Sequence, residues 1–178
     1  DALMLMELPF DVVIEATGSP EAGARHAFAA ITQGKHVVMV SKEADSVVGP
    51  LLSRKAREAG LVYTPVDGDQ PSLLMQLVMW ARVIGLDVLC AGKSSEYDFV
   101  FHRGNEHVTS LDRVTHAPGF NSLWDLEDKI AEKAAQQRAH ALKAIPQHIV
   151  PDLIEMSIVA NALDLDADTP GFHAPISR

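Results

Sequence analysis

Short apolar runs alternate with amphipathic stretches over the first seventy residues. The runs lie at 12–14, at 36–40 ("HVVMV") and at 61–66 ("LVYTPV"), so they begin about 25 residues apart. Short apolar runs of this kind are typical of strands buried in a parallel sheet. Because a helix pattern fills each gap, the sequence predicts successive strand–helix–strand units and an α/β fold class.

The first gap carries clear signals for the start and the end of a helix. Ser19 is a suitable N-cap, Pro20 fits the first helical position, and Glu21 complements the positive end of the helix dipole. Gly34 can adopt the left-handed conformation that often follows a helix. We therefore expect a helix from Pro20 through Ile31, crossing from the first strand to the second.

The second gap predicts a helix that Gly60 ends. Its apolar positions share one face, and its charged positions lie elsewhere. The expected apolar face consists of Val48, Leu51, Leu52, Ala56 and Ala59.

The pattern changes after residue 69. A longer helix is expected there, with Asp69 as its cap, Pro71 near its start and Trp80 in the core. Its broad apolar face comprises Leu73, Leu74, Leu77, Val78, Ala81 and Ile84. Strands are then expected at 86–93 and 97–102, a polar loop from about 103 to 120, and helices at about 124–144 and 151–163.

Composition narrows the classes of partner. The chain has 178 residues, 47% of them hydrophobic, and a net charge of −9. That hydrophobic content can build a core, while the negative charge argues against nucleic acid or an anionic membrane as a partner. A small-molecule ligand is the better expectation.

The single cysteine, Cys90, excludes an internal disulfide framework. Together with the lack of a signal peptide and of a long apolar run, it predicts a cytoplasmic protein. Cys90 itself is expected to be a small buried hydrophobe and not a nucleophile. Because the chain begins at Asp1 without methionine, we also expect a fragment of a longer protein.

Chemistry-bearing residues follow the expected strands. Ligands of parallel sheets bind outside the carboxyl ends of the strands, where Thr17, Gly18, Lys42, Asp67 and Asp69 are expected. Lys42 can polarise a substrate carbonyl, or it can be a solvated loop lysine.

The two aspartates leave two interpretations open. Asp67 and Asp69 can share a divalent cation or act as acid and base. They can equally be turn residues, with Asp69 capping the next helix.

Other site classes are disfavoured. Residues 18–23 ("GSPEAG") have the glycine spacing of a phosphate loop, but Ala24 and Arg25 replace the residues that would hold phosphate and magnesium. The G-x-G-x-x-G fingerprint is absent. The histidines show no tight zinc spacing, so a zinc site is not expected.

Two longer segments resemble a known family. "DVVIEATGSPEAGARHAFAAITQGKHVVMVSKEAD", followed by "PVDGDQPSL", resembles the dinucleotide-binding domain of homoserine-dehydrogenase-like oxidoreductases and the start of their catalytic domain. "GKSSEYDF" and the segment 145–178 are similar to the members of this family that include deoxyxylulose-phosphate-reductoisomerase-like enzymes. The resemblance implies an NAD(P)-dependent oxidoreductase that reduces a small keto or sugar-phosphate substrate.

The resemblance also implies a domain organisation. Residues 1–68 would be the C-terminal half of a Rossmann-type dinucleotide-binding domain, and residues 69–178 an incomplete α+β catalytic or substrate region. The glycine fingerprint would precede Asp1, so the chain alone is not expected to bind a dinucleotide well. The whole protein is expected to be a homo-oligomer.

Site residues follow from matched positions. Ala16, Thr17 and Gly18 match the loop that passes the nicotinamide, and Ser41 and Lys42 match the end of the family's second strand in this part of the sheet. Lys42 would lie near both nicotinamide and substrate, which makes it a catalytic candidate. Lys93 matches a segment that faces the substrate, and is a second catalytic candidate.

A metal site is implied by the reductoisomerase motif Pro-Val-Asp-Ser-Glu-His. Residues 65–70 resemble it, with aspartate for glutamate and glutamine for histidine. Asp67, also a catalytic candidate, and Asp69 would then bind magnesium or manganese, with Glu96 or Asp98 as a third oxygen ligand. The alternatives are a homoserine dehydrogenase that needs no metal and a non-catalytic regulatory or assembly module.

Overall fold

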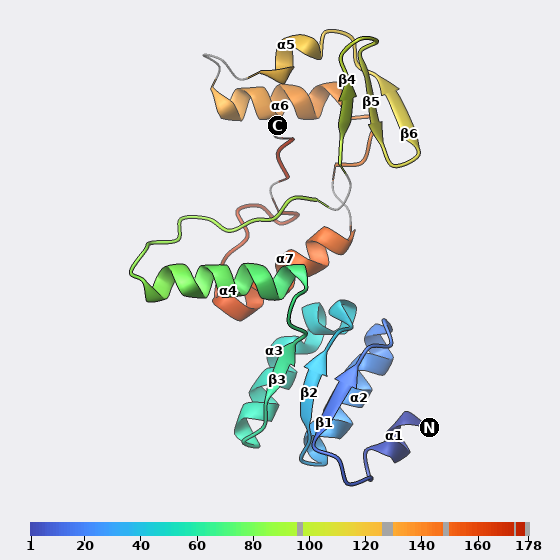
Figure 1. The fold of residues 1–178 in the computed structure, drawn as a ribbon, viewed down its shortest axis with the longest axis vertical. Coiled ribbons are helices and arrows are strands. Elements are labelled where there is room, and N and C mark those ends of the chain that lie inside the picture. Colours follow the sequence, from blue (N-terminus) through green and yellow to red (C-terminus); the bar gives the residue numbers. More distant parts are fainter. Residues whose placement is uncertain (96–97, 126–129, 148–149, 173, 177–178) are drawn as a thin grey trace. The chain divides into compact units, whose positions relative to one another are not determined.

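The structure, a computed structural model, describes residues 1–95, 98–125, 130–147, 150–172 and 174–176. The chain divides into two compact units (Figure 1). Unit 1 comprises Asp1–Lys93 and Ile154–Asp166, and unit 2 comprises Ser94–Leu153 and Ala167–Arg178. Within the described ranges, no helix has both the length and the apolar character needed to cross a membrane.

Unit 1 contains a parallel sheet of three strands in the order β1-β2-β3. The strands are β1 (Val12–Glu15), β2 (His36–Met39) and β3 (Tyr63–Pro65). In register, Val13 lies opposite Val37, and Val37 lies opposite Tyr63. This arrangement confirms the α/β class and the Rossmann-like parallel sheet.

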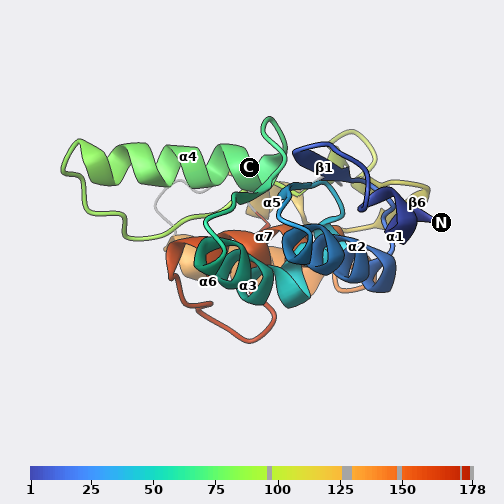
Figure 2. The ribbon, with the colours of Figure 1, turned by 90° about the horizontal axis from the view of Figure 1, so that it is seen from below.

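Two crossover helices, α2 (Pro20–Thr32) and α3 (Lys42–Glu58), lie side by side on one face of the sheet (Figure 2). Ser19 caps α2 by accepting a hydrogen bond from the Ala22 amide, and Gly34 follows the helix with φ of 73°, as predicted. The core between helices and sheet is formed by small and medium side chains, chiefly Ala27, Ala30, Val37, Met39, Leu52 and Ala56. Leu51 departs from the prediction, since it is 43% exposed.

Two further helices complete most of unit 1. α4 (Gln70–Val83) begins directly after its cap Asp69, and α7 (Val150–Leu163) contributes its later turns. A four-residue helix, α1 (Ala2–Leu5), precedes β1. The predicted helices at 69–84 and 151–163 are therefore confirmed.

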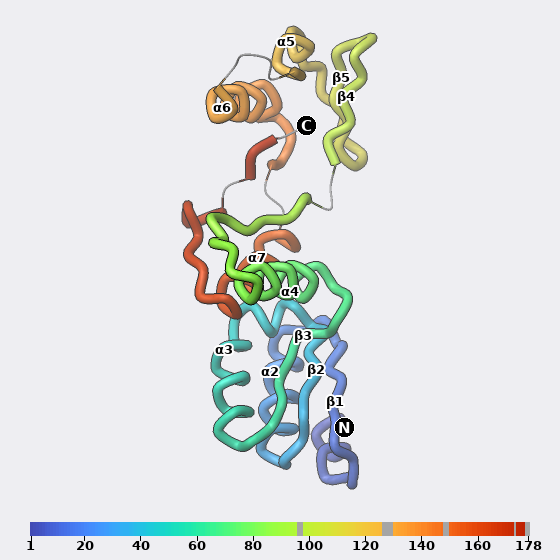
Figure 3. Tube along the Cα trace, turned by 60° about the vertical axis from the view of Figure 1, so that its left-hand side comes forward, coloured from blue at the N-terminus to red at the C-terminus, as the bar shows by residue number. Residues whose placement is uncertain are grey.

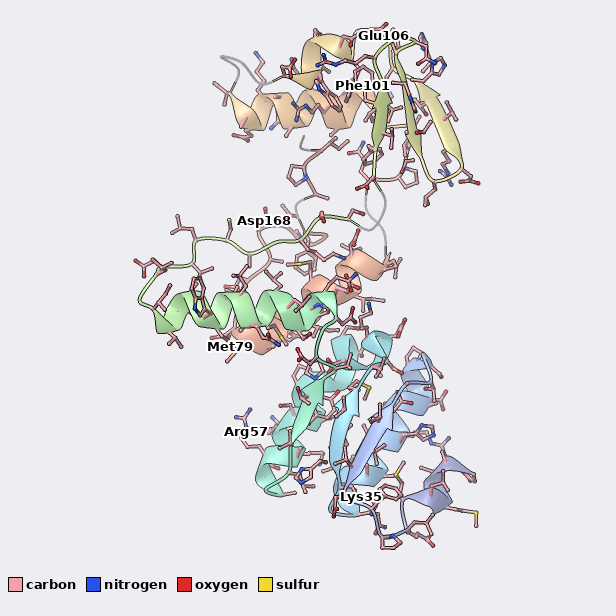
Figure 4. The ribbon with its side chains drawn as sticks, viewed as in Figure 1. Lys35, Arg57, Met79, Phe101, Glu106 and Asp168 are labelled. Atoms are coloured by element: carbon pink, nitrogen blue, oxygen red, sulfur yellow. The ribbon has the colours of Figure 1, made fainter. Side chains whose placement is uncertain are left out.

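The predicted apolar face of α4 is wrong for half of its six residues, since Leu73, Leu77 and Ile84 are exposed. Only a narrow stripe around Val78 packs, against Val159 and Leu163 of α7. Trp80 is 58% exposed and is not a core residue, and Met79 is also largely exposed (Figure 4). The stripe is narrow because α7 is the main partner of α4 in this cluster, and in the part of the chain that the structure describes Leu73, Leu77 and Ile84 are exposed.

The predicted strand at 86–93 does not form. The segment has no ladder partner, although Val88 and Ala91 pack against the α4–α7 cluster as irregular chain. Cys90 is exposed, so its predicted burial is wrong.

Unit 2 contains an antiparallel sheet whose first strand lies within the strand predicted at 97–102 and whose other two strands lie where a loop was expected. Its strands β4 (Val100–His102), β5 (His107–Ser110) and β6 (Arg113–His116) pair in that order. The turns between them place Glu106 and Leu111 in the left-handed region, with φ of 51° and 55°. Residues other than glycine rarely adopt this conformation. The residue types at these two positions therefore do not predict a turn.

The helices of unit 2 are α5 (Asn121–Trp124) and α6 (Ala131–Ala141). α6 is shorter than the predicted helix at 124–144, of which residues 126–129 lie outside the described residues. Phe101 is partly buried and packs against the core of unit 2, with its ring 4.9 Å from that of Phe120 and 5.1 Å from that of Trp124 (Figure 4).

Candidate active site

The site lies at the carboxyl edge of the parallel sheet, beyond which α4 and α7 run (Figure 3). Two loops meet there, one after β1 and one after β2. The Gly18 amide donates a hydrogen bond to Ser41 Oγ over 2.9 Å, which joins the two loops. Lys35, by contrast, lies at the opposite edge, where its ammonium binds the carbonyl oxygens of Leu8 and Phe10 (Figure 4).

The loop after β1 suits close approach by a ligand. Gly18 has φ of 68°, and a Cβ there would meet no atom within 4 Å. Ala16, Thr17 and Gly18 are all exposed, while Ser41 is buried beneath them. The free space at Gly18 and the exposure of all three residues leave room for a ligand at this loop.

Lys42, the first residue of α3, is held by two carboxylates. Its Nζ lies 2.5 Å from Glu155 Oε1 and 3.3 Å from Asp69 Oδ2. Glu155 has no exposed side-chain surface, and its other oxygen binds Lys93. The two predicted catalytic lysines therefore lie on either side of one buried carboxylate.

The ion pairs decide the charge state of Lys42. Partial burial by itself would lower its pKa, but the hydrogen bonds and charges of Glu155 and then Asp69 outweigh burial and raise the pKa above its ordinary value. Lys42 is thus an ammonium at neutral pH. It can stabilise negative charge on an oxygen, and in this state it is not a base.

Glu155 is the functional residue that sequence reasoning missed. It lies on α7 on the same face as Ile158 and Val159, which are buried three and four residues further along. Burying an acidic side chain on the apolar face of a helix costs free energy unless it is paired. The position of Glu155 in the apolar pattern of this helix therefore indicated a buried, paired carboxylate.

Asp67 and Asp69 do not converge on one point. Asp67 Oδ1 accepts hydrogen bonds from the Gly68 amide and from Gln76 Nε2, at 2.9 and 2.6 Å. Asp69 Oδ1 caps α4 at the Gln70 amide, and its Oδ2 faces Lys42. Each aspartate is thus engaged with its own partners, as in the turn-and-cap interpretation.

The described residues around Asp67 and Asp69 do not form a cluster of metal ligands. Among the residues that the structure describes, no group of three histidine, cysteine, aspartate or glutamate side chains is placed to hold a metal ion. Of the predicted third ligands, Glu96 lies outside the described residues, and Asp98 belongs to unit 2.

A small pocket opens beside Lys42. It is lined by Met39, Lys42, Asp45, Pro65, Asp69 and Ile158, among others. Asp45 is buried there and accepts a hydrogen bond of 2.6 Å from the Tyr63 hydroxyl. Burial raises the pKa of Asp45, and the bond from Tyr63 only partly offsets this.

Two family models match the chain. Residues 1–65 match the NAD binding domain of homoserine dehydrogenase, and residues 68–178 match the catalytic domain of the oxidoreductase DRL. Together with the Rossmann-like sheet, these matches define an NAD(P)-dependent oxidoreductase. Because the second match covers more than half of the chain, the chain belongs to the DRL oxidoreductase family. No curated protein matches the sequence.

The structure thus brings the predicted site residues into two groups. Thr17, Gly18 and Ser41 lie together at the two loops, and Lys42, Lys93 and Asp69 lie around Glu155. Asp67 belongs to neither group, since it is held by Gln76. The domain division at residues 68 and 69, and the roles of the individual site residues, stay predictions.

Proposed function

We propose that this oxidoreductase transfers a hydride between NAD(P) and a small keto or hydroxy substrate without a metal ion. In this proposal Lys42 and Lys93 bind the reacting oxygen, and Ala16, Thr17, Gly18 and Ser41 surround the nicotinamide. The observation that carries the proposal is the buried carboxylate of Glu155 between the two lysines.

The charges suit the reduction of a carbonyl group. A lysine ammonium has three donors, and Glu155 and Asp69 engage two of those on Lys42, which leaves one for a substrate oxygen. The bound cofactor supplies the hydride for the carbonyl carbon. A lysine ammonium then gives the oxygen its proton, and Glu155 holds both lysines in place.

Two activities fit this proposal to different degrees. The first is the homoserine dehydrogenase reaction, taken in the direction that forms homoserine: the carbonyl carbon receives a hydride and the oxygen receives one proton, which a lysine ammonium can donate. A reductoisomerase-like reaction on a sugar phosphate is the second candidate, supported by the resemblance of residues 65–70 and of Lys42-Glu43 to that motif. It would require Asp67 and Asp69 to turn from their present partners toward magnesium or manganese. The match to an oxidoreductase catalytic domain disfavours a non-catalytic module.

A homo-oligomer and a cytoplasmic location are parts of this proposal. The exposed apolar side chains of α4, such as Leu77 and Trp80, support self-association. Analytical ultracentrifugation of the full-length protein measures its oligomeric state.

The test uses the full-length protein stripped of metal with a chelator. Homoserine oxidation and deoxyxylulose phosphate reduction are assayed with NAD and NADP cofactors, with and without added manganese. We expect metal-independent turnover, lowered about a hundredfold or more in Lys42→Ala because a positioned cation contributes roughly 3 kcal/mol to the transition state. Arg57→Ala, at an exposed position of α3 (Figure 4), is the matched control.

Two results would contradict the proposal. Activity that depends on manganese and is abolished by Asp67→Asn would establish the reductoisomerase-like alternative. Activity of Lys42→Ala equal to that of Arg57→Ala would remove Lys42 from the chemistry.

A further inference from the structure

A second buried carboxylate lies directly beneath the loop after β1. Glu15 is the last residue of β1, and only 2% of its side chain is exposed. Its Oε1 accepts hydrogen bonds from the Thr17 hydroxyl at 2.7 Å and from the Thr17 amide at 3.3 Å, and it lies 3.3 Å from His26 Nδ1. The Thr17 contacts fix the first turn of the loop from below.

The carboxylate of Glu15 stays ionised in this setting. Burial raises its pKa, but hydrogen bonds from the side chains of Ser41, Thr17 and His26 outweigh burial and hold the pKa below its ordinary value. A buried ionised group needs such partners. Here Thr17 and Ser41 belong to the two loops, and His26 belongs to α2.

Glu15 also contacts the loop after β2 through its main chain. Its carbonyl oxygen accepts hydrogen bonds from the amides of Val40 and Ser41, at 2.8 and 3.3 Å. Ser41 Oγ in turn accepts the hydrogen bond from the Gly18 amide. One residue therefore sets the positions of Thr17, of Ser41 and, through Ser41, of Gly18.

The helices close around this carboxylate. Gly23 of α2 leaves the space that Glu15 occupies, because a Cβ at Gly23 would lie 3.0 Å from Glu15 Oε2 and 3.0 Å from Ala44 Cβ. A larger residue at position 23 would displace the carboxylate. The close approach of α2 thus keeps the Glu15 side chain aimed at the loops.

We propose that Glu15 is a positioning residue for cofactor binding, whose carboxylate holds the Thr17–Gly18 backbone and Ser41 in the arrangement that the nicotinamide end of the dinucleotide contacts. The inference rests on the proposed assignment of these loops to the nicotinamide. Glu15 does not touch the cofactor and acts through Thr17 and Ser41.

The experiment compares two ligands on the full-length protein by calorimetry. Reduced dinucleotide carries the nicotinamide, whereas adenosine diphosphate ribose lacks it. In Glu15→Gln, which keeps the shape but loses the charge, we expect the Kd of the reduced dinucleotide to rise about tenfold, as for the loss of charge-assisted hydrogen bonds. The Kd of adenosine diphosphate ribose should change less than about twofold, because this ligand has no nicotinamide to contact the loop. The tenfold change expected for the dinucleotide corresponds to about 1.4 kcal/mol.

Variants of neighbouring residues give matched comparisons. Thr17→Val, which removes one donor to Glu15, should show the same selective weakening, and its effect should not add to that of Glu15→Gln. Glu21→Gln, at an exposed position in the first turn of α2, should change neither affinity. Gly18→Ala, which strains the left-handed backbone, tests the loop assignment independently.

The outcomes separate the two proposals. If Gly18→Ala weakens the dinucleotide selectively and Glu15→Gln does not, the positioning role is overturned while the loop assignment stands. Equal weakening of both ligands by Glu15→Gln would reduce Glu15 to a general structural residue. If Gly18→Ala and Thr17→Val leave both affinities unchanged, the loop assignment and the positioning role are both overturned.

Discussion

Glu155 has no exposed side-chain surface, and two lysines bind its two oxygens. A buried carboxylate without partners costs several kcal/mol, so the lysines stabilise it and it fixes them in return. The same contacts raise the pKa of Lys42. The charge state of the proposed catalytic cation thus depends on a residue more than a hundred positions away in the chain.

Replacing Glu155 with glutamine should change the pH profile of the enzyme as well as its rate. Activity that needs the Lys42 ammonium falls as the pH rises through the pKa of Lys42. Because Glu155 is the main group that raises this pKa, we expect the alkaline limb of kcat/KM to move to lower pH in Glu155→Gln. Turnover should also fall at least about tenfold, since the loss of one charged hydrogen bond contributes roughly 1.5–3 kcal/mol.

Glu58→Gln, at an exposed position on α3, is the control for the Glu155 variant. An alkaline limb that stays at the same pH in Glu155→Gln would show that Lys42 does not govern that limb.

Asp45 gives a pH prediction for stability. Burial raises its pKa in the folded state above the ordinary value of 3.8, so the folded state keeps the proton to a higher pH than the unfolded chain does. The free energy of unfolding therefore decreases as the pH rises from 3.8 through the folded pKa, and the loss persists at neutral pH. Asp45→Asn avoids this loss and keeps an oxygen that accepts the Tyr63 hydrogen bond.

Urea unfolding of wild type and Asp45→Asn at about pH 7 and about pH 3 checks this expectation. The asparagine variant should be at least as stable as wild type near neutral pH, by about 1.4 kcal/mol for each unit by which the folded pKa is raised. The difference should vanish at the acidic end. Asp87→Asn, at an exposed position, is the control. If Asp45→Asn stabilised the protein more at acidic pH than at neutral pH, the predicted direction of the pH dependence would be wrong.

At the scale of elements, the residue that caps α4 is also part of the candidate site. Asp69 uses one oxygen to cap α4 and the other to face Lys42. Asp69→Asn should keep the cap, whereas Asp69→Ala should lose it and lower the free energy of unfolding by about 1 kcal/mol. Both variants should weaken turnover similarly, since both lose the charge beside Lys42.

Thermal unfolding and steady-state kinetics on the two Asp69 variants separate these effects. Asp112→Ala, an exposed turn aspartate in unit 2, is the reference for loss of a carboxylate elsewhere. Equal stability of Asp69→Asn and Asp69→Ala would mean that the cap contributes nothing.

The elements also show what the sequence can predict. The bounds of α2 follow from Ser19, Pro20 and Gly34, because a cap, a fixed φ and a left-handed glycine act locally. β5 and β6 were not predicted because the turn between them contains Leu111 with a positive φ. A leucine side chain does not favour that conformation, so the residue type does not indicate a turn. Helix bounds set by a cap, a proline or a glycine can be predicted from a sequence. A left-handed backbone conformation at a leucine cannot.

The same distinction applies to the site. Lys42, Gly18 and Asp69 were found because the ends of parallel strands meet at one edge of a sheet. The pairing of Lys42 with Glu155 joins residues 113 positions apart, and no periodicity within α7 specifies that partner. Asp67 was assigned to a metal by resemblance, and its bond to Gln76 came from the position of α4.

At the scale of the molecule, each unit has its own core and its own tryptophan. Trp80 belongs to unit 1 and Trp124 to unit 2. In unit 2 the buried Arg138 donates hydrogen bonds to the carbonyl oxygens of Leu123, Trp124 and Ile176, at 2.7, 2.9 and 3.1 Å. The planar guanidinium thereby ties α6 to α5 and to the C-terminal segment.

Arg138→Lys should destabilise unit 2 selectively. One ammonium cannot reproduce the fork of donors, so buried carbonyl oxygens lose partners at a cost of about 2 kcal/mol. In a Trp80→Phe background, where fluorescence reports Trp124, we expect a lower urea midpoint. In a Trp124→Phe background the midpoint of Trp80 should not change.

Gln137→Lys, at an exposed position of α6, is the control for the introduced lysine. Equal shifts of both tryptophan signals would show that the two units unfold as one.

The separation of Lys42 and Glu155 along the chain has a consequence for biosynthesis. A ribosome that adds roughly 5–20 residues per second needs about 6–23 seconds to pass from the lysine codon to the glutamate codon. Within that interval the core that β1, β2, α2 and α3 share receives its last residues, Leu52 and Ala56, while the ammonium of Lys42 still lacks Glu155 as its counter-ion. The nascent chain can therefore pack these helices on the sheet before the ion pairs around Glu155 form.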